Sequence, residues 1–580
     1  MNILGIHDGH TSSAALIRDG RFFGVVQEER YTRTKNQGGF PEHAIAEILD
    51  LAGLSWSNVD AAAFSTQTFR NDAMRDRTEV MAVFDDLFSG TCHAPIRKTR
   101  DDTPDASSPS KKATVRSDRL RAEGFAGPIE FIDHHTCHAS AAYFARGQFD
   151  SGRCAVLTAD GQGDGASGAV FVGEGCTLTE KCHIPRDDSI AQIYSYLTYL
   201  LGFVPLEHEY KLMGLAPYAA GSKGAREISQ FFFSMFAQPS AGEYAWRRVD
   251  GVPPSELQAG FLFEKLKRRR FDELAAGLQI FFEEFVTEWA LNVTRTLQTN
   301  ELAVAGGAFM NVKLNQRLSQ HPSIADFYVV PSCGDESNSL GAAWALSSKI
   351  DVPPEGGMRD IYCGRRYGPD EYERALNTLK STDVFIVRPN DIEGTVAEHL
   401  AAGKIVARFA AGAEFGARAL GNRSILSRPD SIENLQEINS AIKSRDFWMP
   451  FAPSILDVGA NRLLSTKALP YSPHMMISFD TTNEGAKLLA AAIHPKDKTA
   501  RAQILRQEDN ESYYRLVECF HTLTGIPAVL NTSFNIHGEP IVETPEDAVS
   551  VFVRSELRTL ALGPYLLTKS DRHGHPENLA

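Results

Sequence analysis

Two histidines lie four residues apart in a segment whose composition favours a helix. His134 and His138 belong to DHHTCHASAAYFAR, residues 133–146, and this segment is rich in alanine. Positions i and i+4 share one face of a helix, so both imidazoles can reach one divalent metal. His135 faces elsewhere and is the weaker candidate. The alternative is a polar helix start with unrelated histidines, and the spacing alone does not decide between them.

Carboxylates that could complete a metal site lie in glycine-rich turns. Asp160 and Asp164 occur in TADGQGDGASG, and Asp335 occurs in PSCGDESNSLGAA. A ligand set that mixes imidazole nitrogen with carboxylate oxygen suits iron, manganese or zinc, and it does not choose among them.

The elements that must position these residues include a repeated strand–loop–strand unit. Residues 3–21 read ILGIHDGHTSSAALIRDGR, and residues 156–175 read VLTADGQGDGASGAVFVGEG. Each unit has an apolar strand, an Asp-Gly turn, a second apolar strand and an acidic hairpin turn. Such a loop points backbone N–H groups at phosphate, while its aspartate holds a metal or the metal's water. One copy is commonly only a turn, but two copies predict a duplicated α/β fold with a nucleotide between its halves.

A third segment has adjacent glycines where a strand runs into a helix. Residues 302–311 read LAVAGGAFMN, and the helix-like VKLNQRL follows. The two glycines would let the backbone approach a ligand at a helix N-terminus. The candidate nucleotide contacts are therefore Gly161, Gly163, Gly306, Gly307 and Asn311.

Length and composition exclude several classes of protein. The chain has 580 residues, which suggests two or three domains. Charged residues make up 23% and hydrophobic residues 43%, as in soluble globular proteins, so global disorder and fibrous classes are excluded. The 73 acidic and 59 basic side chains give a net charge of −14, which argues against a nucleic-acid partner.

The cellular setting expected from the sequence is the cytoplasm. No apolar run reaches the roughly 18 residues of a membrane span, so we expect no membrane partner. The start, MNILG, enters a strand at once, and we expect no signal peptide. The 8 cysteines include no CxxC pair and do not resemble a disulfide framework.

Three polar stretches divide the chain. Thr99–Asp118 has no apolar period, and we expect a mobile loop there. Residues 237–256 are rich in Pro, Ser and Gly and interrupt a helical region. Residues 350–358, IDVPPEGGM, mark the main domain boundary.

These divisions predict two domains of unequal size. We expect one domain at 1–349, with halves of about 1–175 and 176–349. A linker at 350–360 and a second α/β domain at 361–570 follow it.

Five longer blocks resemble a known family. They are QEERYTRTKNQGGFP (27–41), EHEYKLMGLAPY (207–218), AGAEFGARALGNRSIL (411–426), IKSRDFWMPFAPSIL (442–456) and LNTSFNIHGEPIVETPEDA (530–548). On these blocks the chain resembles the antibiotic- and nodulation-type O-carbamoyltransferases, the group that includes the nebramycin and cephamycin tailoring enzymes. The resemblance extends over nearly the whole chain.

The resemblance implies two modules and a reaction. The N-terminal module is similar to the universal tRNA threonylcarbamoyl transferase, within the actin-like ATPase superfamily. The C-terminal module is similar to the YrdC-type fold that forms carbamoyl-adenylate. The implied reaction uses carbamoyl phosphate, ATP and Mg²⁺ to make carbamoyl-adenylate. The carbamoyl group then passes to an acceptor, usually a hydroxyl of a small molecule such as a natural product or a sugar. A homodimer is expected at the level of the family.

The resemblance also implies which residues bind carbamoyl phosphate. The ligand is a dianion and needs fixed cations. In the sequence, Arg423 lies near Arg418, and Arg445 lies near Lys443. Lys35 resembles a family residue that reaches across to the C-terminal site. The expected set is Lys35, Arg418 and Lys443, with Ser533 and Asn535 as hydrogen-bonding groups.

Transfer to a hydroxyl needs a base, because the hydroxyl must lose its proton. His10 matches the histidine of the family's first motif and is the expected base, while Asp8 would orient it or the acceptor. His7 is off the motif, and we expect it to be incidental. The family's metal ligands fall on His134, His138, Asp160 and Asp335. One departure occurs at Ala417, where the family usually has proline.

Other functions fit part of the pattern. A sugar-type kinase of the actin-like superfamily would share the repeats but has no use for the HxxxH segment. A hydrogenase-maturation carbamoyltransferase would add an acylphosphatase domain and CxxC zinc motifs, which the chain lacks. A catalytically inactive nucleotide-binding regulator would not need Lys35, His10, Arg418 and Lys443. The acceptor stays open, and so does N-carbamoylation of an amine.

Overall fold

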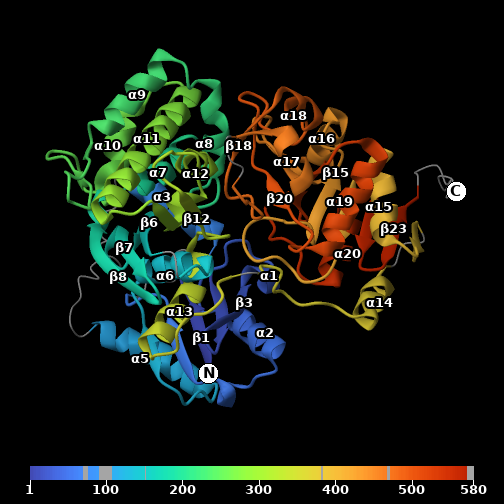
Figure 1. The fold of residues 1–580 in the computed structure, drawn as a ribbon, viewed down its shortest axis with the longest axis horizontal. Coiled ribbons are helices and arrows are strands. Elements are labelled where there is room, and N and C mark those ends of the chain that lie inside the picture. Colours follow the sequence, from blue (N-terminus) through green and yellow to red (C-terminus); the bar gives the residue numbers. More distant parts are fainter. Residues whose placement is uncertain are drawn as a thin grey trace. The chain divides into compact units, whose positions relative to one another are not determined.

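The fold of the protein is described from a computed structural model. It describes residues 1–68, 76–89, 108–149, 152–358, 360–379, 383–466 and 470–570. The chain divides into two compact units, Met1–Arg359 and Asp360–Ala580, each with its own sheets and core (Figure 1).

The first unit begins with a five-stranded sheet of order β3-β2-β1-β4-β5. Its first three strands form an antiparallel meander, whereas β4 runs parallel to β1, and β5 runs parallel to β4. The strands are β1 (Asn2–His7), β2 (Ser13–Arg18), β3 (Arg21–Gln27), β4 (Ala61–Phe64) and β5 (Ile129–Phe131). Helices α1 (Glu29–Thr32) and α2 (Glu42–Ala52) follow the meander, and α2 packs on β2 and β3.

A second five-stranded sheet repeats this topology in the order β12-β11-β6-β7-β8. Its strands are β6 (Arg153–Gly163), β7 (Ala166–Glu174), β8 (Thr177–Pro185), β11 (Glu301–Ala305) and β12 (Asp326–Val329). Again a meander of three strands precedes two parallel strands. The repetition confirms the predicted duplicated α/β domain. The predicted boundary between its halves near residue 175 is wrong, because β6 and β7 hydrogen-bond within the second sheet.

Each sheet is covered by a helix from the other half of the duplicated domain. Helix α6 (His134–Arg146) packs on β6 and β11, and α13 (Asn338–Lys349) packs on β1 and β2. The two helices also pack on each other (Figure 1). Glycine makes this approach possible, since a Cβ at Gly341 would lie 1.8 Å from the carbonyl oxygen of Cys137.

A helical layer lies between β8 and β11 in the sequence. It comprises α7 (Ala191–Leu200), α8 (Glu209–Leu215), α9 (Lys223–Phe233), α10 (Gln258–Leu266) and α11 (Phe271–Leu297), and α12 (Val312–Ser319) follows β11. Residues 237–256 contain only the end of β9 (Phe236–Ala237), the short β10 (Arg247–Arg248) and the start of a 3-10 turn. This irregular stretch still contributes to the core, because Trp246 packs edge-to-face on Trp289 of α11.

The prediction of a mobile loop at Thr99–Asp118 is wrong for the residues that the structure describes. Helix α5 (Ser108–Ala122) occupies residues 108–118, and residues 99–107 lie outside the described residues. The helix is so polar that its sequence shows no apolar periodicity. Its own residues Arg116 and Leu120 are nevertheless buried. Helix α3 (Arg77–Ser89) precedes this region.

The second unit contains an eight-stranded mixed sheet of order β13-β23-β22-β14-β15-β21-β16-β20. Its strands are β13 (Val384–Val387), β14 (Val406–Phe409), β15 (Arg423–Ser427), β16 (Ala452–Leu456), β20 (Gln503–Leu505), β21 (Ala528–Ser533), β22 (Thr559–Leu562) and β23 (Tyr565–Lys569). A small sheet joins β17 (Leu464–Ser465), β18 (Phe479–Thr481) and β19 (Thr499–Ala500). The fold is therefore mixed α/β in both units, as predicted.

The second unit also contains several helices. They are α14 (Pro369–Asn377), α15 (Ile392–Ala401), α16 (Ile432–Ile438), α17 (Asp457–Leu463), α18 (Asn483–Leu488), α19 (Glu511–Thr524) and α20 (Pro545–Arg554). Among the residues that the structure describes, none of the helices combines the length and apolar character needed to cross a membrane.

Candidate active site

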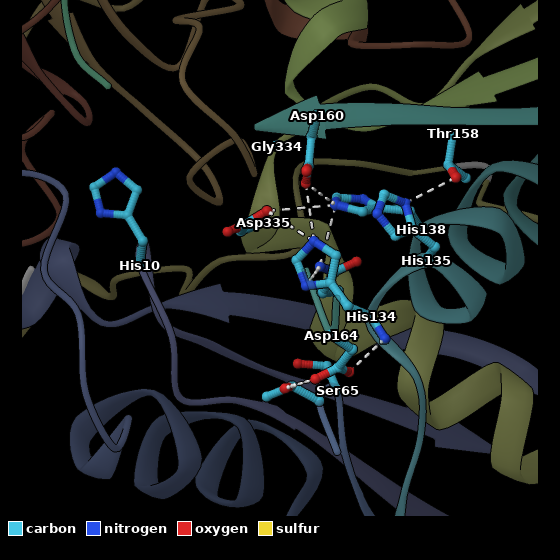
Figure 2. A network of polar contacts seen from close by, with 12 residues as sticks. His10, Ser65, His134, His135, His138, Thr158, Asp160, Asp164, Gly334 and Asp335 are labelled. Atoms are coloured by element: carbon cyan, nitrogen blue, oxygen red, sulfur yellow. Dashed lines mark hydrogen bonds and ion pairs between the residues drawn. The ribbon is translucent and has the colours of Figure 1, made fainter. Parts of the chain in front are cut away.

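Four side chains from three segments converge at one point of the first unit (Figure 2). His134 and His138 come from the first turns of α6, Asp160 from β6, and Asp335 from the turn before α13. One potential ligand atom from each lies within 4.8 Å of the others. The structure thus brings together the four residues proposed from the sequence as metal ligands.

The two imidazoles face the same carboxylate. His134 Nε2 lies 2.9 Å from Asp160 Oδ2, and His138 Nε2 lies 3.2 Å from the same atom. Asp335 Oδ1 lies 3.6 Å and 3.3 Å from these two nitrogens. Burial lowers the pKa of His134, but the carboxylates of Asp160 and Asp335 outweigh burial and raise it to about 9.

The donor set fits a transition metal. Asp160 Oδ1 is buried and has no hydrogen-bond partner among the described residues. A buried carboxylate oxygen without a partner is costly, and a cation would satisfy it. Two imidazoles with two carboxylates suit iron, manganese or zinc.

The start of α6 is fixed by two further carboxylates. Asp133 caps the helix by accepting a hydrogen bond from the N–H of Thr136. Asp164 Oδ2 accepts from the N–H of His134 at 2.9 Å. The remaining bonds of Asp164 come from the backbone of Gln67 and from Thr66 and Thr68. Asp164 therefore orients a ligand-bearing helix and is not itself part of the candidate metal set.

Two further residues lie beside the metal set, and one of them, Asn338, was missed from the sequence. Asn338 Nδ2 lies 3.2 Å from His138 Nε2. The only sequence feature that could have indicated Asn338 is its position three residues after Asp335. The other is Gly163, one of the candidate nucleotide contacts, where a Cβ would lie 2.0 Å from the ring of His134. Its lack of a side chain leaves room for the imidazole.

Residues 8–11, which we name the His10 loop, follow β1. His7 Nε2 donates to the carbonyl oxygen of His10 at 2.9 Å, and Nδ1 accepts from Ser65 Oγ at 2.7 Å. Burial lowers the pKa of His7 to about 4, which keeps the ring neutral for this role. The expectation that His7 is incidental is therefore wrong, because it holds the backbone of the loop.

His10 presents a buried imidazole nitrogen that no described residue satisfies. Its Nδ1 has no hydrogen-bond partner in the described part of the chain. Figure 2 shows its ring apart from the histidines of the metal set. An unsatisfied buried nitrogen is suited to meeting a group of a bound ligand.

The Asp8 carboxylate pairs with an arginine. Both of its carboxylate oxygens accept hydrogen bonds from the guanidinium of Arg116 on α5, each at 2.7 Å. The sequence did not indicate this partner, because it lies in a segment whose polar composition resembled a loop.

The candidate nucleotide glycines cluster around the end of β6. Gly306 has a φ of 98°, and a Cβ there would lie 2.3 Å from the carbonyl oxygen of Ala159. A Cβ at Gly307 would lie 3.9 Å from the Cβ of Asp160, which directly precedes Gly161. Asn311 does not share this position: it caps α12 and hydrogen-bonds to Gln279.

Lys35 joins two of the sequence blocks within the first unit. Its Nζ donates to Glu207 Oε1 at 2.7 Å. The charge of Lys35 helps to lower the pKa of Glu207 against the effect of burial. The pair connects the block 27–41 with the block 207–218.

Three of the residues expected to bind carbamoyl phosphate meet in the second unit. Lys443 Nζ donates to Asn535 Oδ1 at 2.6 Å, to the carbonyl oxygen of Asn535 at 3.1 Å and to Ser533 Oγ at 3.1 Å. Ser533 Oγ donates in turn to Asn535 Oδ1 at 2.7 Å. Lys443 is only 3% exposed.

The arginines of the same blocks have different roles. Arg418 is partly buried in the connection between β14 and β15, directly after the exposed Ala417. Arg423 is fully buried, lies 3.7 Å from the ring centroid of Phe409 and donates to the carbonyl oxygen of Ala410. Arg445 donates to Thr532 Oγ1 at 3.3 Å. Arg423 therefore supports the fold.

Comparison with known families covers most of the chain. Residues 2–344 match the family described as "Carbamoyltransferase N-terminus", and residues 397–569 match "Carbamoyltransferase C-terminus". The chain belongs to the carbamoyltransferase family. This carbamoyltransferase is therefore a transferase enzyme.

Several relatives extend over most of the carbamoyltransferase. "Nodulation protein NolNO" of Sinorhizobium fredii is 31% identical over 99% of this chain and 80% of its own. "Nodulation protein NolO" of Bradyrhizobium diazoefficiens is 31% identical over 76% of this chain and 79% of its own. The uncharacterized protein MJ1051 of Methanocaldococcus jannaschii is 28% identical over 98% of this chain and 99% of its own.

Solved structures show more distant similarity. HypF of T. kodakarensis is 12% identical, with a TM-score of 0.33 over 60% of this chain and 48% of its own. ROK hexokinase of Thermus thermophilus is 14% identical, with a TM-score of 0.27 over 61% of this chain and its full length.

Proposed function

We propose that this carbamoyltransferase uses carbamoyl phosphate, ATP and one water molecule, with Mg²⁺, to form carbamoyl-adenylate. Water releases phosphate from carbamoyl phosphate, and the resulting carbamate displaces pyrophosphate from ATP. It then transfers the carbamoyl group to a hydroxyl of a small molecule, of the natural-product or sugar class, in the cytoplasm, and AMP is released. The observation on which this rests is the buried Lys443, held by Ser533 and Asn535 in a chain that matches both carbamoyltransferase domains.

Activation is assigned to the second unit, which we propose is the YrdC-like module. Lys443 is buried and lies beside Ser533 and Asn535, so an ammonium at this place could contribute to the binding of a phosphate dianion. Arg418 in the neighbouring block would add a second, planar cation. Ser533 and Asn535 hold the lysine and offer polar groups to the carbamoyl amide.

Transfer is assigned to the first unit. The unsatisfied Nδ1 of His10 would accept the proton of the acceptor hydroxyl as oxygen attacks the carbamoyl carbon. Gly161, Gly306 and Gly307 would let the nucleotide phosphate approach the backbone near Asp160. Bound by His134, His138, Asp160 and Asp335, a transition metal would supply positive charge that holds the adenylate phosphate.

The test measures both half-reactions with the full-length protein. It is incubated with carbamoyl phosphate, Mg²⁺ and ATP, and pyrophosphate release is followed. A panel of hydroxylated natural-product intermediates and sugars is then added, and each is examined by mass spectrometry for one added carbamoyl group. Matched amine analogues distinguish O- from N-carbamoylation. ADP release with a phosphorylated acceptor, independent of carbamoyl phosphate, would instead show a kinase.

A further inference from the structure

Asp8 belongs to an ion pair that is closed to solvent. Arg116 Nε donates to Asp8 Oδ2 and the terminal nitrogen NH2 donates to Oδ1, so the contact is bidentate. The side chains of Arg116 and Asp8 are 5% and 3% exposed. Both oxygens of the carboxylate are therefore engaged by one fixed guanidinium.

Arg116 is itself held on several sides. Its NH1 donates to the carbonyl oxygen of Thr66 at 3.0 Å. The guanidinium carbon lies 5.2 Å from the ring centroid of Phe64 and 5.8 Å from that of Phe131. These contacts fix the guanidinium to the ends of β4 and β5, so Asp8 is bound to a rigid part of the first sheet.

The segment that receives Arg116 also contacts the metal-bearing helix. Ser65 bonds to His7 before the His10 loop. Thr66 Oγ1 donates to Asp164, and Asp164 accepts from the N–H of His134. Residues 65–68 thus connect the His10 loop, α5 and the first turn of α6 in one network of hydrogen bonds.

The backbone of the His10 loop needs such restraint. Thr11 has a φ of 56°, a left-handed conformation that costs energy in a residue other than glycine. A Cβ at Gly9 would lie 2.8 Å from the His7 ring, so the chain folds tightly over that imidazole. A strained loop keeps one conformation only where its surroundings determine it.

We propose that Arg116 is a positioning residue for transfer, which acts through Asp8 to hold the His10 loop. Asp8 is the attachment point of the loop and does not take the proton of the acceptor, because both of its oxygens are occupied. The proposal rests on the proposed function for the role of His10, and it adds a residue that no sequence motif marks.

A double-mutant cycle tests the pairing. Arg116→Met and Asp8→Asn should each lower product formation by about 10²-fold, the usual effect of a small misplacement of a reacting group. Pyrophosphate release and metal content should not change. The double variant should be no slower than the slower single variant, since both remove the same contact. Losses that multiply, or no loss in Arg116→Met, would overturn the proposal.

Hydrogen–deuterium exchange tests the contact without any activity. Arg116→Met should speed amide exchange in residues 8–13, whereas Arg119→Met should not. Arg119 is a matched control on the same helix, because it is exposed and pairs with Glu42 at the surface. If Arg116→Met does not fold, Arg116→Lys keeps the charge, cannot form two parallel bonds, and should speed exchange at the same residues.

The two readouts separate the inference from the proposed function. A wild-type protein that transfers no carbamoyl group would refute the proposed function, while faster exchange at residues 8–13 would still support the Arg116 contact. Unchanged exchange in a folded Arg116 variant would overturn the inference, whatever the wild-type activity.

Discussion

Lys443 and Asp8 are both buried polar groups with defined hydrogen-bond partners. Lys443 donates to Ser533 and Asn535, which are also expected to bind carbamoyl phosphate. Asp8 is neutralised by Arg116, so its charge is used within the protein. Burial of charged groups is costly, and such groups gather at functional sites.

Lys443 and His10 lie in different compact units, which predicts that they affect different half-reactions. Lys443→Ala should abolish carbamoyl-adenylate formation, measured as pyrophosphate release, because no cation then balances carbamoyl phosphate. His10→Ala should retain pyrophosphate release and lose about 10²–10⁴-fold in product, the scale of a lost general base. The exposed Lys487→Ala variant of α18 is the control and should match wild type. Equal loss of both half-reactions in His10→Ala would assign His10 to activation.

His474 should make stability depend on pH. Burial lowers its pKa from 6.5 to about 3. Between these values the unfolded chain binds more protons than the folded one, so stability falls as the pH decreases through this window. This one group can change the free energy of unfolding by at most about 1.4 kcal/mol per pH unit.

The test compares the thermal midpoint of wild type and His474→Gln from pH 7 to pH 4. The wild type should lose more stability than the variant across this range. His183→Gln, which changes an exposed histidine on β8, is the control. Parallel curves for wild type and His474→Gln would contradict the prediction.

At the scale of elements, the metal set depends on how closely α6 approaches β6. Gly163 adjoins the ring of His134, and Asp164 caps the first turn of the helix. The position of the two imidazoles is therefore set by the turn between β6 and β7 as much as by the HxxxH spacing.

A methyl group at Gly163 should consequently weaken metal binding. Gly163→Ala would place Cβ 2.0 Å from the His134 ring, so the ring must shift from its position in the metal set. Elemental analysis should show about one transition metal per wild-type chain, far less in Gly163→Ala, and almost none in His138→Ala. Gly260→Ala on α10 has open space around its Cβ and should bind as wild type does. Full metal content in His138→Ala would remove this site.

The sequence could predict what depends on local spacing. The repeated strand–loop–strand pattern gave the duplicated fold, and His134 and His138 followed from i, i+4 geometry with carboxylates in turns. The partner of Asp8 could not be predicted, because Arg116 lies 108 residues away on a helix without an apolar stripe. The predicted division at residue 175 failed because it falls between β7 and β8, which belong to the same three-stranded meander.

At the scale of the whole molecule, the two compact units predict separable folding. Residues 360–580 have their own sheet and a buried core that includes Phe409, Leu530 and Phe552. Expressed alone, this fragment should unfold cooperatively and bind carbamoyl phosphate, measured by calorimetry, and the Lys443→Ala fragment should not bind. A soluble full-length enzyme with an insoluble fragment would show that the second unit needs the first.

The crossing of α6 and α13 between the two sheets has a consequence for synthesis on the ribosome. Strands β1 to β5 are complete once residue 131 is translated, but α13, which covers β1 and β2, begins only at residue 338. Until then the nascent chain exposes the apolar inner face of its first sheet, which attracts chaperones and favours aggregation. Slowing translation before residue 338 should therefore lower the yield of soluble protein more than slowing it within the second unit.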